Sequence, residues 1–223
     1  MTTNLTELVF ILDRSGSMGG LESDTIGGFN SMLAKQQAVP GECRITTILF
    51  DNEYETLHDR IDIKAVSAIT NHEYFVRGNT ALLDAIGKTI NKIGSVQKNT
   101  AEDFRAEKVL FVITTDGMEN ASREFNYEKI KSMIEHQKSK YGWEFIFLGA
   151  NIDAVEVAGR FGVAENRAQS FHNDSAGIAL NYGVVCETVS AFRAASPGAS
   201  LDDDWSAKIK ADYKKRGARA SKS

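Results

Sequence analysis

The chain has 223 residues, which suits one sizeable domain or at most two small ones. Hydrophobic residues make up 42% and charged residues 25%, a balance typical of globular proteins, and the formal net charge of -4 argues against a generally basic nucleic-acid-binding protein. The amino-terminal segment lacks a basic stretch, and no later apolar run is long enough to span a membrane. We therefore expect a cytoplasmic protein with no membrane partner.

The first part of the chain predicts three strands and one helix. Residues 7–12 (ELVFIL) contain five consecutive apolar residues and no turn residue, which is typical of a buried strand. Apolar residues recur with helical spacing over 21–37, and residues 43–50 (CRITTILF) predict the second strand. Turn residues at 51–53 (DNE) lead into 54–63, so we expect the second and third strands to form a hairpin.

Helical and strand patterns then alternate to the end of the apolar sequence. The predicted elements are a helix over 80–93, a strand over 108–115, a helix marked by Tyr127, Ile130 and Ile134, a strand over 143–150, a short helix over 152–162, a strand over 168–172, and a closing helix with an apolar face from Ile178 to Phe192. This alternation predicts an α/β fold with a doubly wound, mostly parallel sheet covered by helices on both faces. The single hairpin predicts one antiparallel strand near an edge.

The composition changes after Ser196. We predict one domain over residues 1–195, followed by a polar, basic extension over 196–223 that is partly helical and then disordered. Residues 208–223 carry repeated Lys and Arg and have little to bury, so ordering them would not be offset by apolar contacts. A weak contact of this tail with nucleic acid or an acidic partner is the alternative, although we expect no nucleic-acid partner for the domain.

Three loops bring oxygen-bearing side chains to the carboxyl ends of predicted strands. Asp13, Ser15 and Ser17 follow the first strand in FILDRSGSMGG, Thr80 opens a helix in RGNTALLDAI, and Asp116 follows a strand in ITTDGMEN. Sites in open parallel sheets form at this edge. Carboxylate and hydroxyl oxygens are hard ligands that suit Mg²⁺ or Ca²⁺. Each residue taken alone is also a common turn or helix-cap residue.

At these residues the sequence resembles the von Willebrand factor type A (vWA) domain family. DRSGS matches the family's D-x-S-x-S metal motif, Thr80 its separate threonine and Asp116 its second aspartate, and the resemblance covers roughly residues 5–195. The resemblance implies a metal-ion-dependent adhesion site in which the hydroxyls bind Mg²⁺ (or Mn²⁺ or Ca²⁺) directly and one or both aspartates act through water. The lack of a signal segment and of a disulfide framework favours an intracellular member of this family, and from the stand-alone form we expect a bacterial or phage origin.

The motif context favours binding over catalysis. The serines lack the glycine spacing of a hydrolase nucleophile elbow, Ser15 stands where an aspartyl phosphatase has its second acid, and no phosphate-loop lysine follows. We therefore expect no enzyme activity. A cation held mainly by neutral hydroxyls keeps its attraction for anions, so we expect a protein partner that offers a Glu or Asp to the metal.

Two other functions stay open at this point. One is an accessory subunit of an enzyme complex associated with an ATPase, kinase or phosphatase, in which the metal contacts substrate. The other is a structural protein of the same fold with an idle metal site. Partner capture with and without a chelator distinguishes these from the adaptor hypothesis.

Other side chains are expected around or away from this site. Arg14 and Met18 are interpreted as exposed rim residues that either contact a partner or have no role. Seven loop residues are expected on the same face, either as turn formers or as a rim that selects a partner or a second ion: Asp51, Asn52, Glu53, Glu119, Asn120, Asn151 and Asp153. The four histidines show no metal-ligand spacing, and the two cysteines, Cys43 and Cys186, are expected to be reduced, buried and unpaired.

Overall fold

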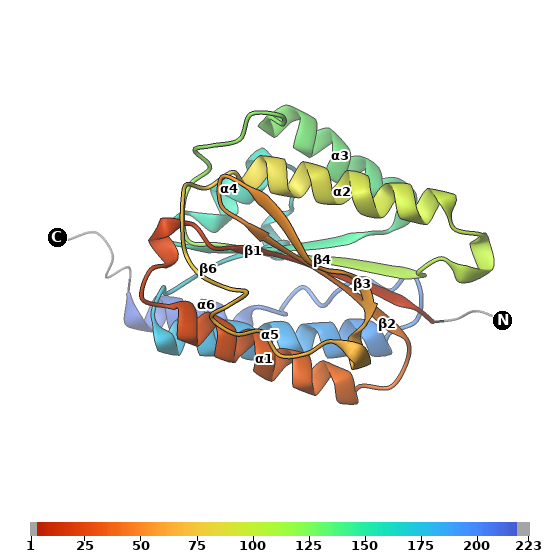
Figure 1. Ribbon diagram of the computed structural model, residues 1–223, viewed down its shortest axis with the longest axis horizontal. Helices are drawn as coiled ribbons and strands as arrows, with labels where there is room; N and C mark the ends of the chain where they lie inside the picture. The colour runs from red at the N-terminus through yellow and green to blue at the C-terminus, as the bar shows by residue number, and fades with distance from the viewer. Residues whose placement is uncertain (1–3, 218–223) are drawn as a thin grey trace.

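The computed structural model describes residues 4–217, which form one six-stranded sheet between two layers of helices (Figure 1). The strands are β1 (Thr6–Asp13), β2 (Cys43–Phe50), β3 (Tyr54–Asp62), β4 (Lys108–Thr115), β5 (Glu144–Ala150) and β6 (Ala168–Phe171). Their order across the sheet is β3-β2-β1-β4-β5-β6. The predicted α/β class with a doubly wound sheet is confirmed.

Only the β2–β3 pair is antiparallel among the described strands; the other four neighbouring pairs are parallel. β3 lies at one edge of the sheet, as the hairpin predicted. Asp51 shapes the hairpin turn, because its Oδ1 accepts a hydrogen bond of 2.7 Å from the backbone N–H of Glu53. The partial exposure of β3 and the continuous burial of β1 follow from their edge and central positions.

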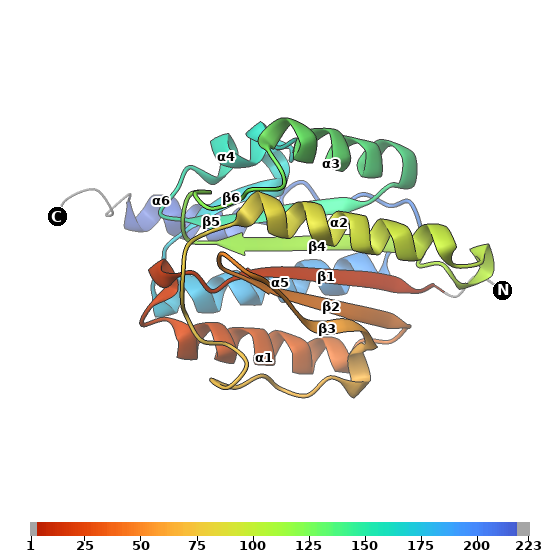
Figure 2. The same ribbon diagram turned by 45° about the horizontal axis from the view of Figure 1, so that its top comes forward.

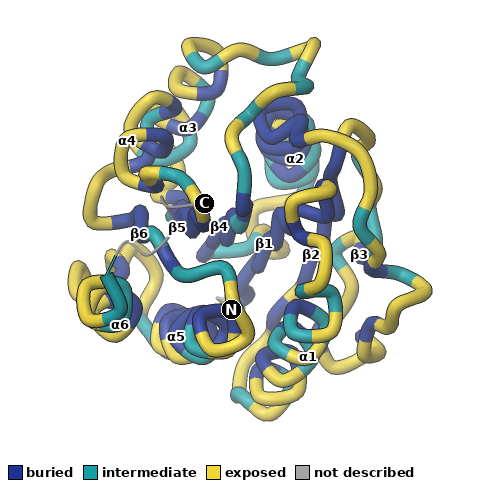
Figure 3. Tube along the Cα trace, turned by 90° about the vertical axis from the view of Figure 1, so that its left-hand side faces the viewer, coloured by how far each residue is buried: buried dark blue, intermediate teal, exposed yellow. Residues whose placement is uncertain are grey.

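Helices cover both faces of the sheet (Figures 2 and 3). α1 (Glu22–Ala38), α5 (Ser175–Ala194) and α6 (Ala207–Arg216) lie on one face. α2 (Leu82–Asn99), α3 (Tyr127–Tyr141) and α4 (Ala154–Arg160) lie on the other. Within residues 4–217, four short 3-10 helices occur in the connections, at Gly16–Met18, Ile63–Ala65, Glu102–Phe104 and Glu165–Arg167.

Each face of the sheet has its own apolar core. In β1, the side chains of Leu8, Phe10 and Leu12 belong to the cluster beneath α1 and α5, while Val9 and Ile11 belong to the cluster beneath α2 and α3. Successive side chains of a strand point to opposite faces, so a central strand needs apolar residues at successive positions to serve both cores. This explains why the central strands are read from sequence as unbroken apolar runs.

The connection over residues 66–81 leads from the α1 layer across the metal-motif end of the sheet to α2 (Figure 2). Asn30 of α1 holds it with two hydrogen bonds of 2.8 Å, one donated to the carbonyl of Ile69 and one accepted from its N–H. Gln37 donates to the carbonyl of Val66 at 2.8 Å. The loop is therefore tied to α1 before it reaches Thr80.

The segment after residue 195 packs against the domain. Leu201, Trp205 and Ile209 are buried in the core beneath α5, and the Trp205 indole donates a hydrogen bond of 2.8 Å to the carbonyl of Asn166. The expectation that residues 208 onward have little to bury is wrong for Ile209, which is 1% exposed. The predicted disorder falls on residues 218–223, outside the described residues, and the boundary at 195 stays a prediction.

Two further expectations concern the whole chain. Cys43 and Cys186 are both buried and free. Burial raises the pKa of the Cys43 thiol to about 11, which keeps it protonated near neutral pH. Among residues 4–217, no helix combines the length and apolar character that crossing a membrane requires.

Candidate metal centre

The predicted metal residues meet where the central strands end. Asp13 is the last residue of β1, Asp116 directly follows β4, and Thr80 lies two residues before α2. β1 and β4 are neighbours at the centre of the sheet, and the chain leaves β1 toward one face and enters α2 on the other. Crevices at such points of reversal are where open α/β sheets bind ligands.

Three hydroxyl groups from two loops form a continuous line. The Thr80 hydroxyl donates a hydrogen bond of 3.1 Å to Ser15 Oγ, and the Ser15 and Ser17 oxygens are 3.2 Å apart. Ser17 then donates to Asp116 Oδ1 at 2.5 Å. The structure thus brings Ser15, Ser17, Thr80 and Asp116 into one network of oxygen atoms.

Asp13 lies behind this line and is held from two sides. Its Oδ1 accepts a hydrogen bond of 2.7 Å from the backbone N–H of Ser15, and its Oδ2 accepts one of 2.5 Å from the Thr115 hydroxyl. The buried Tyr74 hydroxyl donates to the Asp13 backbone carbonyl at 2.6 Å. Both carboxylate oxygens therefore have a fixed direction, which suits a group that orients the serines or bound water.

Asn173 is a site residue that the sequence analysis missed. Its Nδ2 donates a hydrogen bond of 3.0 Å to Asp116 Oδ2, so Ser17 and Asn173 hold the two oxygens of this carboxylate. Asn173 lies in the connection between β6 and α5. No motif spacing marks it, because its contact with Asp116 spans 57 residues and depends on the packing of β6.

The electrostatics of the site favour a cation. Burial raises the pKa of Asp13, and burial together with the nearby Asp13 raises the pKa of Asp116 to about 6. Both residues are 2% exposed, and neither forms an ion pair with a described residue. Two buried carboxylates without a cation are costly, and a divalent cation among the hydroxyl oxygens would relieve that cost.

The donor set fits a hard divalent ion rather than a soft one. Among the described residues, no cluster of three or more His, Cys, Asp or Glu side chains is arranged to hold a metal. A metal at this edge would therefore depend on the hydroxyls of Ser15, Ser17 and Thr80, and oxygen ligands suit Mg²⁺, Mn²⁺ or Ca²⁺. Ser17 is exposed while Ser15 and Thr80 are buried, so the network opens to solvent at Ser17.

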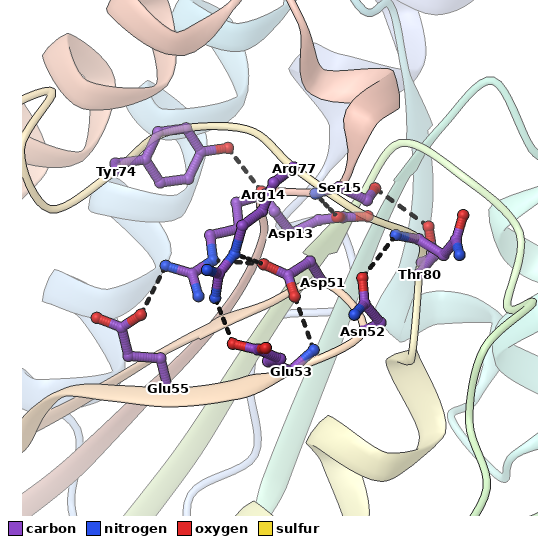
Figure 4. A network of polar contacts seen from close by, with 11 residues as sticks. Asp13, Arg14, Ser15, Asp51, Asn52, Glu53, Glu55, Tyr74, Arg77 and Thr80 are labelled. Atoms are coloured by element: carbon purple, nitrogen blue, oxygen red, sulfur yellow. Dashed lines mark hydrogen bonds and ion pairs between the residues drawn. The ribbon is translucent and has the colours of Figure 1, made fainter.

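The expectation that Arg14 and Met18 are exposed rim residues is wrong. Met18 is 4% exposed, and Arg14 is fully buried behind the metal motif (Figure 4). Arg14 Nε donates to Asp51 Oδ2 at 2.9 Å, and Arg77 Nε donates to the same oxygen at 2.8 Å. Burial tends to raise the pKa of Asp51, but the bonds from Arg77 and Arg14 outweigh it and lower the pKa.

Arg14 and Arg77 together with the three acidic residues Asp51, Glu53 and Glu55 form an ion-pair cluster next to the metal motif. Arg14 Nη1 lies 2.7 Å from Glu55, and Arg77 Nη2 donates to Glu53 at 2.6 Å. The backbone N–H of Arg77 donates to the Arg14 carbonyl at 2.9 Å, which joins the loop before Thr80 to the loop after Asp13. The sequence identified Asp51 and Glu53 as turn or rim residues but not their partners, because the arginines are distant along the chain.

Most of the other predicted loop residues accept hydrogen bonds from backbone N–H groups, and three of them join separate segments of the chain. Asn52 accepts a hydrogen bond of 3.1 Å from the N–H of Asn79, and Asn120 accepts one of 2.9 Å from the N–H of Thr80. Glu119 accepts from the N–H group of Leu83 in α2 and from those of Ala121 and Ser122. The bonds of Asn52, Asn120 and Glu119 therefore fix the loops around Thr80 and Asp116. Asp153 caps α4, and Asn151 has a positive φ of 56°.

Comparison with known families shows that the family model described as von Willebrand factor type A domain matches residues 7–177. No curated protein is similar in sequence at a significant level. Solved structures share the fold at low identity. The vWF domain of the type V pili tip protein Mfa5 from Porphyromonas gingivalis superposes with a TM-score of 0.58 at 12% identity, covering 88% of this chain and 98% of that one.

Two further similar structures contain metal ions. Manganese-loaded TRAP protein from Plasmodium vivax has a TM-score of 0.52 at 17% identity, covering 73% of this chain and 62% of that one. Proximal thread matrix protein 1 from the mussel byssus, with a zinc-occupied MIDAS motif, has 0.54 at 10% identity, covering 83% and 46%. Seven solved chains of similar fold, these two among them, are longer than this one, which covers between 42% and 62% of the length of each.

Proposed function

The chain belongs to the von Willebrand factor type A domain family, and from that premise we propose that it is a metal-dependent protein-binding module. Asp13, Ser15, Ser17, Thr80 and Asp116 would hold one divalent cation, Mg²⁺ or else Mn²⁺ or Ca²⁺. The observation that carries the proposal is the line of three hydroxyls ending on Asp116, above two buried carboxylates that lack a cation partner. Domains of this family are often metal-dependent interaction modules and are usually not catalytic.

The chemistry of the site supports recognition of a carboxylate. A divalent cation, when bound, supplies an electrophilic position that accepts an anionic oxygen. Ser15, Ser17 and Thr80 would place neutral oxygens on it, and the exposed position of Ser17 leaves that side open. We therefore propose a protein partner that presents a Glu or Asp to the metal.

The surroundings of the site also bear on the kind of partner surface. Met118, two residues after Asp116, is 57% exposed, and Phe75 is 42% exposed in the loop that carries Arg77. Arg14 and Arg77 lie over the Phe75 ring at 5.4 and 5.6 Å, which holds that ring in place. Apolar side chains next to the acidic residue of the partner would find contacts there.

The cytoplasmic location stays part of the proposal, and two buried free thiols suit it.

Calorimetry with Mg²⁺ and Mn²⁺ tests the metal site. We expect one ion per chain, loss of binding in Asp13→Ala, and at least about tenfold weaker binding in Thr80→Ala, since removing even an outer metal partner has that effect. Thr80→Ser keeps the hydroxyl and should restore most of the affinity. Circular dichroism should show the same fold with and without EDTA, because two apolar cores hold the sheet.

Two kinds of result would contradict the proposal. If wild-type protein binds no divalent ion at millimolar concentration, or if Asp13→Ala and Thr80→Ala bind it as wild type does, these residues do not form the site. If the ion binds but a partner is retained in EDTA, the metal does not mediate the interaction, and the accessory-subunit or idle-site alternative gains.

A further inference from the structure

The connection between β6 and α5 reaches the metal centre through one side chain. Asn173 Nδ2 donates to Asp116 Oδ2, while Asn173 Oδ1 is buried and has no hydrogen-bond partner among the described residues. The side chain is therefore held at one end only. Its position depends on the backbone of residues 172–174 and on the groups that fix the two flanking residues.

Both flanking residues are held by α6. The imidazole of His172 stacks on the ring of Tyr213, with ring centroids 4.7 Å apart and an angle of 27° between the planes. The carboxylate of Asp174 accepts a hydrogen bond of 2.6 Å from Arg216 Nη1. Thus α6 contacts the residue before and the residue after Asn173.

The same contacts connect α6 to the start of α5. Asp174 Oδ1 accepts a hydrogen bond of 2.8 Å from the N–H of Gly177 and caps α5. A Cβ at Gly177 would lie 1.9 Å from the carbonyl oxygen of His172 and 3.2 Å from Arg216 Nη2. Only glycine fits where the loop, the first turn of α5 and α6 approach one another so closely.

The residues of α6 that make these contacts are themselves fixed. Arg216 Nε and Nη2 both donate to Asp212 Oδ2, at 2.9 and 2.6 Å, one turn earlier on the same helix. Ile209 anchors the helix in the core. The helix lies outside the part of the chain that matches the family model, which ends at residue 177.

We propose that α6 tunes the metal centre: Tyr213 and Arg216 hold residues 172–174 so that Asn173 positions Asp116 for the ion. This inference rests on the metal site proposed above. Asn173 is a positioning residue in this scheme, and α6 is a device by which the carboxyl-terminal segment changes metal affinity. Coupling of two sites is reciprocal, so metal binding must also stabilise the docking of α6.

Mn²⁺ alone is the probe, with affinity measured by electron paramagnetic resonance or calorimetry on the full chain. We expect Asn173→Ala to bind Mn²⁺ about tenfold more weakly. The double variant Tyr213→Ala/Arg216→Ala should bind about twofold to thirtyfold more weakly, the usual range for residues that act through others. Tyr213→Phe keeps the stacked ring and should retain wild-type affinity.

Lys208→Ala is the matched control on the same helix. Lys208 pairs with Glu187 at 2.6 Å and forms no hydrogen bond or ion pair with residues 172–174, so its loss should leave Mn²⁺ affinity unchanged. Urea denaturation of each variant separates a loss of affinity from a loss of folding.

Hydrogen exchange on the wild type adds a test that needs no α6 variant. Mg²⁺ should slow hydrogen exchange over residues 207–216, and Asp13→Ala should abolish that effect.

The outcomes are distinguishable. A wild type that binds no Mn²⁺ contradicts the proposed function itself. A wild type that binds Mn²⁺ while Asn173→Ala binds equally well overturns the positioning role. If Asn173→Ala is weakened but the double variant is not, or if Mg²⁺ leaves exchange in α6 unchanged, the role of α6 is wrong.

Discussion

At the scale of single residues, burial is the main influence on the two carboxyl groups of the site. Asp13 and Asp116 have been removed from water, and each accepts hydrogen bonds from hydroxyl or amide groups rather than from a cationic side chain. Such bonds only partly replace hydration of the charged form. The raised pKa values therefore indicate that the charged forms of both carboxyl groups are less stable in this site than in water.

This predicts a pH-dependent stability of the metal-free protein. Asp116 has an ordinary pKa of 3.8 when unfolded and about 6 when folded, so the native state binds more protons between these values. Stability should fall as pH rises from 4 to 7, by up to about 3 kcal/mol from this group. Asp116→Asn should flatten that dependence and stabilise the metal-free protein at pH 7.5 in urea titrations with EDTA.

Saturating Mg²⁺ should reverse the ranking, because the wild type then gains binding energy that Asp116→Asn lacks. Asp103→Asn, at an exposed position of a 3-10 helix, serves as the control and should change neither curve. Equal pH dependence of wild type and Asp116→Asn in EDTA would show that this carboxyl is not perturbed.

At the scale of elements, α1 packs against α5 in one helix layer. Each of these helices begins just after a segment that carries residues of the site. Gly28 of α1 lies against the Tyr182 ring of α5, and an added Cβ would come within 2.3 Å of that ring. Gln36 of α1 donates to Ser190 of α5 at 2.7 Å and to the Cys186 carbonyl at 3.0 Å. Both loops that carry site residues on this side, before α1 and before α5, depend on this contact.

Gly28 and its neighbour Gly27 provide a matched test of that contact. Gly28→Ala must displace Tyr182 or separate the helices, and overpacking of this kind costs about 1–3 kcal/mol. Gly27 is exposed, with nothing within 4 Å of an added Cβ, so Gly27→Ala should stabilise the helix by about 0.5–1 kcal/mol. Urea midpoints that shift in the same direction for both variants would contradict this packing.

At the scale of the whole molecule, the carboxyl-terminal segment completes one of the two cores. Leu201, Trp205 and Ile209 cover apolar surface beneath α5, and Arg167 donates to the Leu201 carbonyl at 2.8 Å while lying 3.2 Å from Glu144. The segment is therefore held to the edge of the sheet by apolar and polar contacts together. It is also the segment through which the proposed coupling to Asn173 runs.

Trp205→Ala tests whether this segment belongs to the folding unit. A buried tryptophan that packs in a core loses about 3–5 kcal/mol on truncation, so the unfolding midpoint should fall sharply. Phe104, which is 67% exposed, is the control, and Phe104→Ala should change stability by less than about 0.5 kcal/mol. Similar small effects for both variants would place the segment outside the cooperative unit, as the boundary at 195 predicts.

The sequence by itself determined the strands, the helices and five residues of the candidate site. Central strands carry long apolar runs because both their faces are covered, and helices repeat their apolar positions at a different spacing, so both are visible locally. Asp13 ends β1, Ser15 and Ser17 follow it within four residues, and Thr80 and Asp116 lie next to element ends that the same pattern locates. Topology then brings the three loops to one edge.

Only the tertiary structure decided which side chains support that site. The burial of Arg14, its contact with Asp51, and the bond from Asn173 to Asp116 join residues 37 and 57 positions apart, and no local pattern encodes such pairs. The packing of Trp205 could not be predicted for a related reason. A short polar segment with a few apolar residues is interpreted as solvated unless the apolar surface against which those residues pack is known. Long-range contacts, not local propensities, set these positions, because each depends on where another element lies in the fold.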